Sequence, residues 1–234
     1  MASATSDPDA YYRVYKALHL ITHRAIPCAD NSLKGWHVNQ QITLPPCSAQ
    51  CPSGKKPKPP ASCPECVAWG LAIESALYQP TTVHAKAKPQ LTWSNINQPN
   101  LGRSHVEVAK AFVLRLPHKQ GGPLYTKMSD FDSASLLMVM ARFSMFHNGD
   151  PASYDIIMKV AGIRNDLSHM GLKDDMHLVD HTVKQYFQNI ADFVTCLEGL
   201  HPNHFTSAQD VRDRLKEIQS EPITAKMKKT CTWS

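Results

Sequence analysis

The feature that most constrains folding is a run rich in proline and cysteine, which reads PPCSAQCPSGKKPKPPASCPEC. A segment with so few apolar side chains cannot bury a core of its own, so another interaction must hold it in place. Cys47 and Cys51 form a CxxxC pair, and Cys63 and Cys66 form a CxxC pair after eleven intervening residues. Two thiolate pairs at this spacing are typical of a structural zinc site, in which four protein ligands leave no open position for catalysis.

Two alternatives to this zinc site remain open. The four thiols could stay reduced and unliganded, or one pair could be replaced as ligands by Cys28, His37 or His84. A long proline-rich loop in a compact chain needs a staple, and this favours structural zinc. We therefore expect a zinc-stapled insertion at residues 28–66. Its basic run, KKPK, could contact phosphate, although such runs more commonly form solvated loops.

Helical periodicity dominates the rest of the chain, and no segment has the alternation of a convincing strand. We expect an all-α fold, an antiparallel bundle within a domain at 1–200, followed by a C-terminal helix within 201–221 and a basic tail at 222–234. The first helix should end at Pro27, because proline interrupts helical hydrogen bonding. The bundle helices are predicted at residues 8–24, 67–79, 104–116, 129–147, 151–170 and 175–200.

Composition describes a globular, intracellular chain. Hydrophobic residues make up 42% and charged residues 19% of 234 residues, which excludes a disordered protein. The start, MASATSDPDA, lacks the basic and apolar regions of a signal peptide, and no run approaches the ~20 apolar residues of a membrane span. We expect a cytoplasmic protein, in which seven cysteines argue for metal or free thiols over disulfides. The net charge of +5 fits an anionic partner without proving one.

A cluster of polar residues follows an apolar helical face in the stretch IIMKVAGIRNDLSHMG. Asn165 and His169 lie four residues apart and therefore share a face, and Ser168 lies four residues after Arg164. An arginine can hold a phosphate and a histidine can accept and return a proton near neutral pH. Together they suit metal-independent cleavage of RNA through attack by its 2'-hydroxyl. The structural alternative is that Arg164 and His169 only complement the helix dipole.

This arginine, asparagine and histidine pattern resembles the motif of the HEPN superfamily. The resemblance implies an all-α bundle and, in many members, a metal-independent endoribonuclease that acts as a dimer, whereas other members are inactive RNA- or nucleotide-binding relatives. We expect Arg164 to clamp the phosphate and His169 to act as general acid or base. Asn165 and Ser168 would orient these two residues or contact the scissile group. One helix supplies half a cleft, so the expected partners are single-stranded RNA and a second copy of the chain.

Other segments are similar, in their order along the chain, to an animal family named for a human X-chromosome open reading frame. They are CPECVAW, TWSN, EVAKAF, KQGGP and RNDLSH. This resemblance implies the layout of the chain and brings no activity with it.

A non-catalytic adaptor is the competing function. A zinc-containing helical bundle could bind a protein or nucleic acid, and the basic tail could bring it near a membrane. The C-terminal CTWS places Cys231 where a prenylated cysteine would stand, although Trp233 occupies a position where an aliphatic residue is preferred. A nucleotide transferase or sensor is a weaker alternative, since the chain has no glycine-rich phosphate loop and we expect no small-molecule cofactor.

Overall fold

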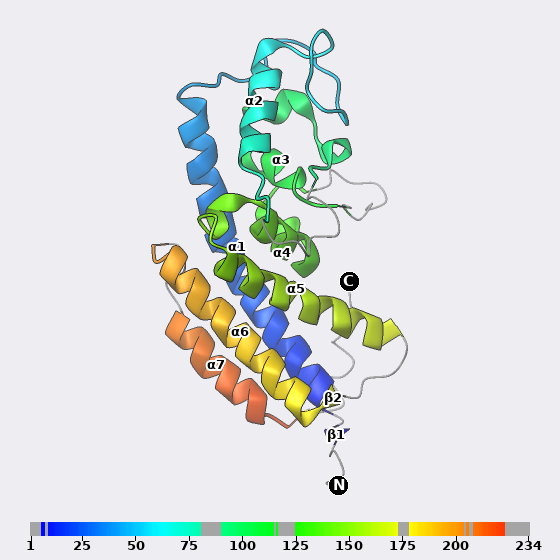
Figure 1. The fold of residues 1–234 in the computed structure, drawn as a ribbon, viewed down its shortest axis with the longest axis vertical. Helices are drawn as coiled ribbons and strands as arrows, with labels where there is room; N and C mark the ends of the chain where they lie inside the picture. The colour runs from blue at the N-terminus through cyan, green and yellow to red at the C-terminus, as the bar shows by residue number, and fades with distance from the viewer. Residues whose placement is uncertain are drawn as a thin grey trace. The chain divides into compact units, whose positions relative to one another are not determined.

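The structure, a computed structural model, describes residues 6–7, 9–80, 90–114, 116, 125–172, 178–203, 205 and 208–222. These residues form seven α-helices, which confirms the predicted all-α fold class. Regular strand pairing in the described part is limited to β1 (Ser6–Asp7) and β2 (Leu178–Val179), which pair antiparallel. The helices are α1 (Ala10–Gln41), α2 (Pro64–Ser75), α3 (His105–Lys110), α4 (Ser133–Arg142), α5 (Pro151–Leu172), α6 (Asp180–Leu200) and α7 (Ala208–Ser220) (Figure 1).

The chain divides into two compact units. Residues 1–25 with residues 152–234 form one, called here the terminal unit, and residues 26–151 form the other, the central unit. The sequence-based division into a 1–200 domain and a C-terminal helix does not coincide with these boundaries. The cysteine-rich segment belongs to the central unit, and the RNDLSH motif belongs to the terminal unit.

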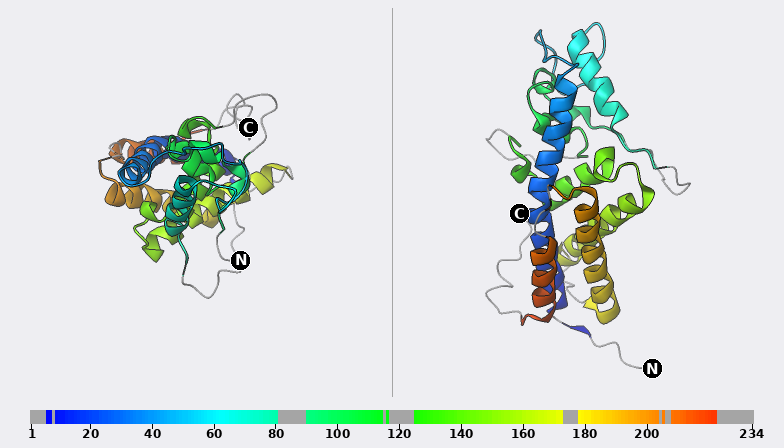
Figure 2. Two further views of the ribbon diagram at one scale, coloured as in Figure 1. Left: turned by 90° about the horizontal axis from the view of Figure 1, so that it is seen from above. Right: turned by 90° about the vertical axis from the view of Figure 1, so that its left-hand side faces the viewer.

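Helix α1 corrects the predicted end of the first helix and the start of the insertion. The helix passes Pro27 and continues to Gln41, as its unbroken ribbon in Figure 2 shows. An internal proline costs roughly 3 kcal/mol because it removes one hydrogen bond and crowds the preceding turn. Beyond it, Ala29, Leu33 and His37 recur every four residues and are buried in the central unit. Their burial offsets the cost of the proline, so the irregular segment is residues 42–63.

The core of the terminal unit is built from the start of α1 and from α5, α6 and α7. Figure 1 shows α6 and α7 side by side and running in opposite directions. The Tyr11 hydroxyl, buried on α1, donates to the Leu167 carbonyl of α5 at 3.2 Å. On α6, Tyr186 donates to the Asp166 carboxylate of α5 at 2.7 Å. The buried apolar side chains of the three later helices are Ile157, Val160, Ile163, Leu167, Phe187, Ile190, Phe193, Val194, Leu197, Ala208, Val211, Leu215 and Ile218.

Aromatic side chains fill the core of the central unit. Phe143 makes edge contacts with Trp36 and Phe112 at centroid separations of 5.2 and 4.8 Å. Trp69, from α2, is completely buried and contacts Trp36 edge-on at 6.3 Å. Such contacts fix ring orientations and add to the free energy gained from apolar burial.

Two helices of the central unit are shorter than predicted. Ser104 caps α3, its hydroxyl accepting a hydrogen bond from the Glu107 backbone amide at 3.4 Å. The Glu107 carboxylate binds Lys110 and the Asn97 amide, and the helix ends at Lys110. The predicted helix at 129–147 is α4 flanked by the 3-10 turns Met128–Asp130 and Ser144–Phe146.

Candidate functional sites

Four thiols gather where the irregular segment meets α2. The sulfur atoms of Cys47, Cys51, Cys63 and Cys66 all lie within 4.8 Å of one another. The Cys47 Sγ is 3.6 Å from both the Cys51 Sγ and the Cys63 Sγ. Sulfur atoms about 2.3 Å from a tetrahedral metal ion stand about 3.8 Å apart, so these separations match a four-thiolate site. The four cysteines could therefore hold a metal ion.

Backbone amides point at two of the sulfurs. Cys63 is the N-cap of α2, and its sulfur accepts from the Cys66 amide at 3.5 Å. The Cys51 sulfur accepts from the Cys63 amide at 3.2 Å. Amide donors and the positive end of a helix dipole both stabilise thiolate over thiol. This donor environment fits the deprotonated sulfur that a metal ion requires.

Burial and mutual hydrogen bonding give these thiols different pKa values. Burial raises the pKa of the Cys66 thiol above its ordinary value, and hydrogen bonds with the other three thiols raise it further. At Cys47 burial also opposes ionisation, but hydrogen bonding with the Ala49 backbone and the neighbouring thiols outweighs it and lowers the pKa to about 7. One thiol in the cluster therefore ionises readily while another resists, and a bound cation would deprotonate both.

Gln98 supports the cluster from a different part of the chain. Its side chain is fully buried, accepts from the Ser62 hydroxyl at 2.9 Å and donates to the Lys55 carbonyl at 2.7 Å. Its own carbonyl accepts from the Cys66 sulfur at 3.6 Å. Sequence reasoning missed Gln98, because a single glutamine in an irregular segment carries no periodic or spacing signal. Its contacts exist only once residues 53–62 and 93–98 lie together.

A second contact region anchors the start of the irregular segment. The Trp69 indole donates to the Pro45 carbonyl at 3.0 Å, and its ring stacks on His37 at a centroid separation of 4.9 Å. A Cβ at Gly102 would lie 2.6 Å from the Pro46 Cα and 2.9 Å from the Trp69 Nε1, so only glycine fits there. The segment is thus fixed to α2 before it reaches Cys47.

The alternative metal ligands are excluded where the structure describes them. His37 bonds through its Nε2 to the Leu101 carbonyl at 2.7 Å, and Cys28 is buried on α1 outside the cluster. His84 lies outside the described residues. Of the predicted ligand sets that can be examined, the structure brings together Cys47, Cys51, Cys63 and Cys66.

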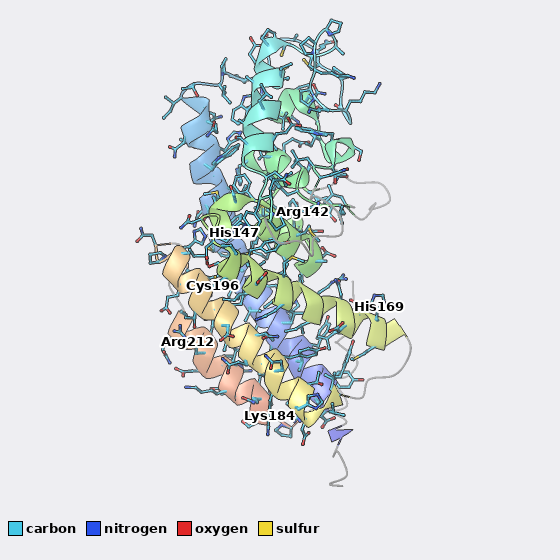
Figure 3. The ribbon with its side chains drawn as sticks, in the orientation of Figure 1. Arg142, His147, His169, Lys184, Cys196 and Arg212 are labelled. Carbon is cyan, nitrogen blue, oxygen red and sulfur yellow. The ribbon has the colours of Figure 1, made fainter. Side chains whose placement is uncertain are left out.

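The RNDLSH motif lies in the last turns of α5, and Figure 3 labels His169 there. Helix α5 buries its apolar face and leaves Asn165 and His169 exposed. Arg164 is half-buried and engaged in interactions of its own. The Ser168 hydroxyl donates to the Arg164 carbonyl at 3.0 Å, within the same helix. One chain therefore presents an amide and an imidazole together on one helix surface, beside a partly covered guanidinium.

Helix α5, predicted to end at residue 170, includes Gly171 and continues to Leu172. Cys231, the predicted lipidation site, lies outside the described residues. None of the helices in the part of the chain that the structure describes is both long and apolar enough to cross a membrane.

Comparison with known proteins identifies the family of the chain. No curated protein and no solved structure is significantly similar to the chain. The family described as a domain of unknown function, DUF4559, matches residues 9–231, which includes both compact units, the cysteine cluster and the RNDLSH motif. The chain therefore belongs to the DUF4559 family.

Proposed function

We propose that this protein binds single-stranded RNA and cleaves it without a catalytic metal, as its resemblance to HEPN endoribonucleases implies. The observation that carries the proposal is the exposure of Asn165 and His169 on one surface of α5, whose opposite face is buried. A histidine that only complemented a helix dipole would need no such neighbours. An exposed imidazole beside an amide and a guanidinium can meet a phosphodiester.

Each residue has a role in this reaction. His169 takes the proton from the 2'-hydroxyl or returns one to the leaving 5'-oxygen, as general base or acid. Arg164 binds the phosphate and stabilises the charge that develops on it. Asn165 donates from its amide to the same group. The Ser168 hydroxyl already donates to the Arg164 carbonyl, so it serves to orient the helix turn and can only accept from the substrate.

One α5 surface supplies half of a cleavage site. We infer a homodimer in which two copies of α5 face one strand of RNA, so that His169 of one copy and Arg164 of the other act on the same phosphate. Mixing an Arg164→Ala chain with a His169→Ala chain tests this arrangement. A dimer that shares its sites should recover part of the activity that each variant lacks alone.

We further propose that the cysteine cluster holds Zn²⁺. A set of four thiolates is the preferred environment of this ion, and the sulfur separations match its tetrahedral geometry. The residues that would hold it are Cys47, Cys51, Cys63 and Cys66. Zinc bound by four protein ligands orders the segment and takes no part in cleavage.

The test incubates purified, metal-replete protein with mixed-sequence single-stranded RNA in the presence of EDTA. Wild type should leave cyclic or 3'-phosphate ends, and His169→Ala should be inactive at nearly unchanged thermal stability, because His169 is exposed. His23→Ala removes another exposed histidine of the terminal unit and should retain activity. Repeating the assay without EDTA separates zinc loss from a missing activity. Equal cleavage by wild type and His169→Ala would refute the assignment.

A non-catalytic adaptor is the second candidate, and two observations favour it. Arg164 is half-buried with existing interactions, and the Ser168 hydroxyl is bonded within its own helix. A motif whose groups are already engaged would serve structure more than chemistry. Under this alternative, RNA or a protein binds without being cleaved, and Arg164→Ala lowers the melting temperature of the terminal unit.

A further inference from the structure

The segment between the two cysteine pairs carries three lysines and no acidic residue of its own. Lys55, Lys56 and Lys58 are all exposed, and no aspartate or glutamate occurs from residue 43 to residue 64. Lys56 forms an ion pair with Glu74 of α2 at 2.6 Å. Among the described residues, Lys55 and Lys58 form no ion pair, so their ammonium groups remain available to an anion.

This basic loop, residues 53–58, is held in one conformation. The Gly54 amide donates to the Ile96 carbonyl at 2.8 Å, and Gln98 fixes the Lys55 carbonyl. Pro57 is buried against Gly70 of α2, so a Cβ at that glycine would lie 3.2 Å from the proline ring. Because the backbone is already ordered, binding a ligand through the lysines would cost little backbone entropy.

An aromatic side chain stands in the segment that supports the loop. Trp93 begins the 3-10 turn Trp93–Asn95 and is partly exposed. The loop reaches this segment through Gly54, whose Cβ position would lie 3.7 Å from the Ser94 carbonyl oxygen. The turn itself is fixed, since the Asn95 amide donates to the carbonyls of Lys110 and Val113 at 3.2 and 2.7 Å.

We propose that the basic loop and Trp93 form a binding surface for single-stranded RNA, separate from the α5 motif. Lys55 and Lys58 contact consecutive phosphates, and Trp93 stacks on an unpaired base. The lysine ammonium groups contact the phosphate backbone, and the indole ring can stack on any base. The surface therefore binds strands with little sequence preference. A duplex keeps its bases stacked on one another and offers none to Trp93. The proposal rests on the RNA-binding function proposed above and adds the site that holds the strand.

The test measures binding of zinc-replete protein to a fluorescent 2'-O-methyl oligouridylate of about 12 nucleotides, a typical length for a single-strand site. This probe lacks the 2'-hydroxyl nucleophile, so binding is measured without cleavage. Lys55→Gln with Lys58→Gln should weaken binding about tenfold at low salt and reduce the slope of log affinity against log salt by about 1.4, or 0.7 for each phosphate contact. Trp93→Leu should weaken binding about tenfold, whereas Trp93→Phe retains a stacking ring and most of the affinity.

Lys56→Gln is the control within the same loop: it removes one positive charge, against two in the double variant, at a lysine already paired with Glu74. It should change affinity less than about twofold. Equal losses for Lys56→Gln and the double variant would reduce the effect to net charge and overturn the proposal, as would wild-type affinity in the double variant or equal competition by a duplex. The cleavage assay is a separate measurement, so absence of cleavage by wild type together with intact loop binding would refute only the nuclease.

Discussion

Replacing Cys66 by serine tests the metal centre at its most buried ligand. The Cys66 side chain is 1% exposed, and a serine hydroxyl fits its space without supplying a thiolate. Structural zinc binds four-ligand peptides with about 10–16 kcal/mol, so an equal share for one thiolate is about 3 kcal/mol. We expect Cys66→Ser to lose about a hundredfold in zinc affinity, as about 1.4 kcal/mol corresponds to each factor of ten.

Competition with a chromogenic chelator measures this affinity, and elemental analysis after gel filtration gives the stoichiometry. The control is Cys28→Ser, which also buries a hydroxyl in place of a thiol but lies on α1 outside the cluster. That variant should lose stability and keep one zinc per chain. If Cys66→Ser bound zinc as tightly as wild type, or if wild-type protein purified from zinc-supplemented cells carried no metal, the four-thiolate centre would be wrong.

Three further substitutions test the packing around the sites. Gly102→Ala should destabilise the central unit by about 1–3 kcal/mol in denaturant unfolding, because its methyl group would lie 2.6 Å from the Pro46 Cα. Unchanged stability would show that the backbones at Gly102 and Pro46 are not in close contact. Tyr186→Phe should cost the terminal unit about 1 kcal/mol, since Asp166 loses a hydrogen bond but can bind water in its place; a wild-type melting curve would contradict this. Burial lowers the pKa of His147, against a hydrogen bond with the Ala141 backbone that raises it. The unfolded chain therefore binds more protons below the ordinary histidine pKa of about 6.5, and stability falls as the pH drops from there towards the lower folded value. His147→Gln should flatten that acid limb relative to wild type, and an identical pH dependence would remove His147 as its cause.

Sequence periodicity predicted the helices whose burial follows a regular repeat. Helix α6 was expected at 175–200 and occupies Asp180–Leu200, with Phe187, Ile190 and Phe193 on its buried face. The predicted helix ended at Pro27 because a proline removes a helical hydrogen bond. The prediction did not include the free energy gained when Leu33 and the residues around it are buried. Burial against residues that are distant in sequence can outweigh a local cost of a few kcal/mol.

The candidate metal site followed from spacing alone, because cysteine pairs on tight turns are a local signal. The groups that order the site did not. Gln98 and Trp69 donate hydrogen bonds to backbone carbonyls of other segments. A glutamine or a tryptophan in a sequence does not by itself predict such a contact. For α5, the sequence predicted which residues share a face, and the structure adds that Arg164 is half-buried while Asn165 and His169 are exposed.

The irregular segment between α1 and α2 indicates what a bound metal ion would contribute to the fold. Residues 42–63 contain no α-helix, so their conformation depends on the cysteine cluster, Gln98 and the contact of Trp69 with Pro45. Closing a loop of about 20 residues, as between Cys47 and Cys66, costs roughly 3 kcal/mol of chain entropy. Hydrogen bonds of Gln98, Trp69 and Gly54 contribute about 1 kcal/mol each, which is only comparable with that cost. Four metal–thiolate bonds would add the surplus that orders the segment, and the lysines of the proposed RNA surface would then stand on a fixed backbone.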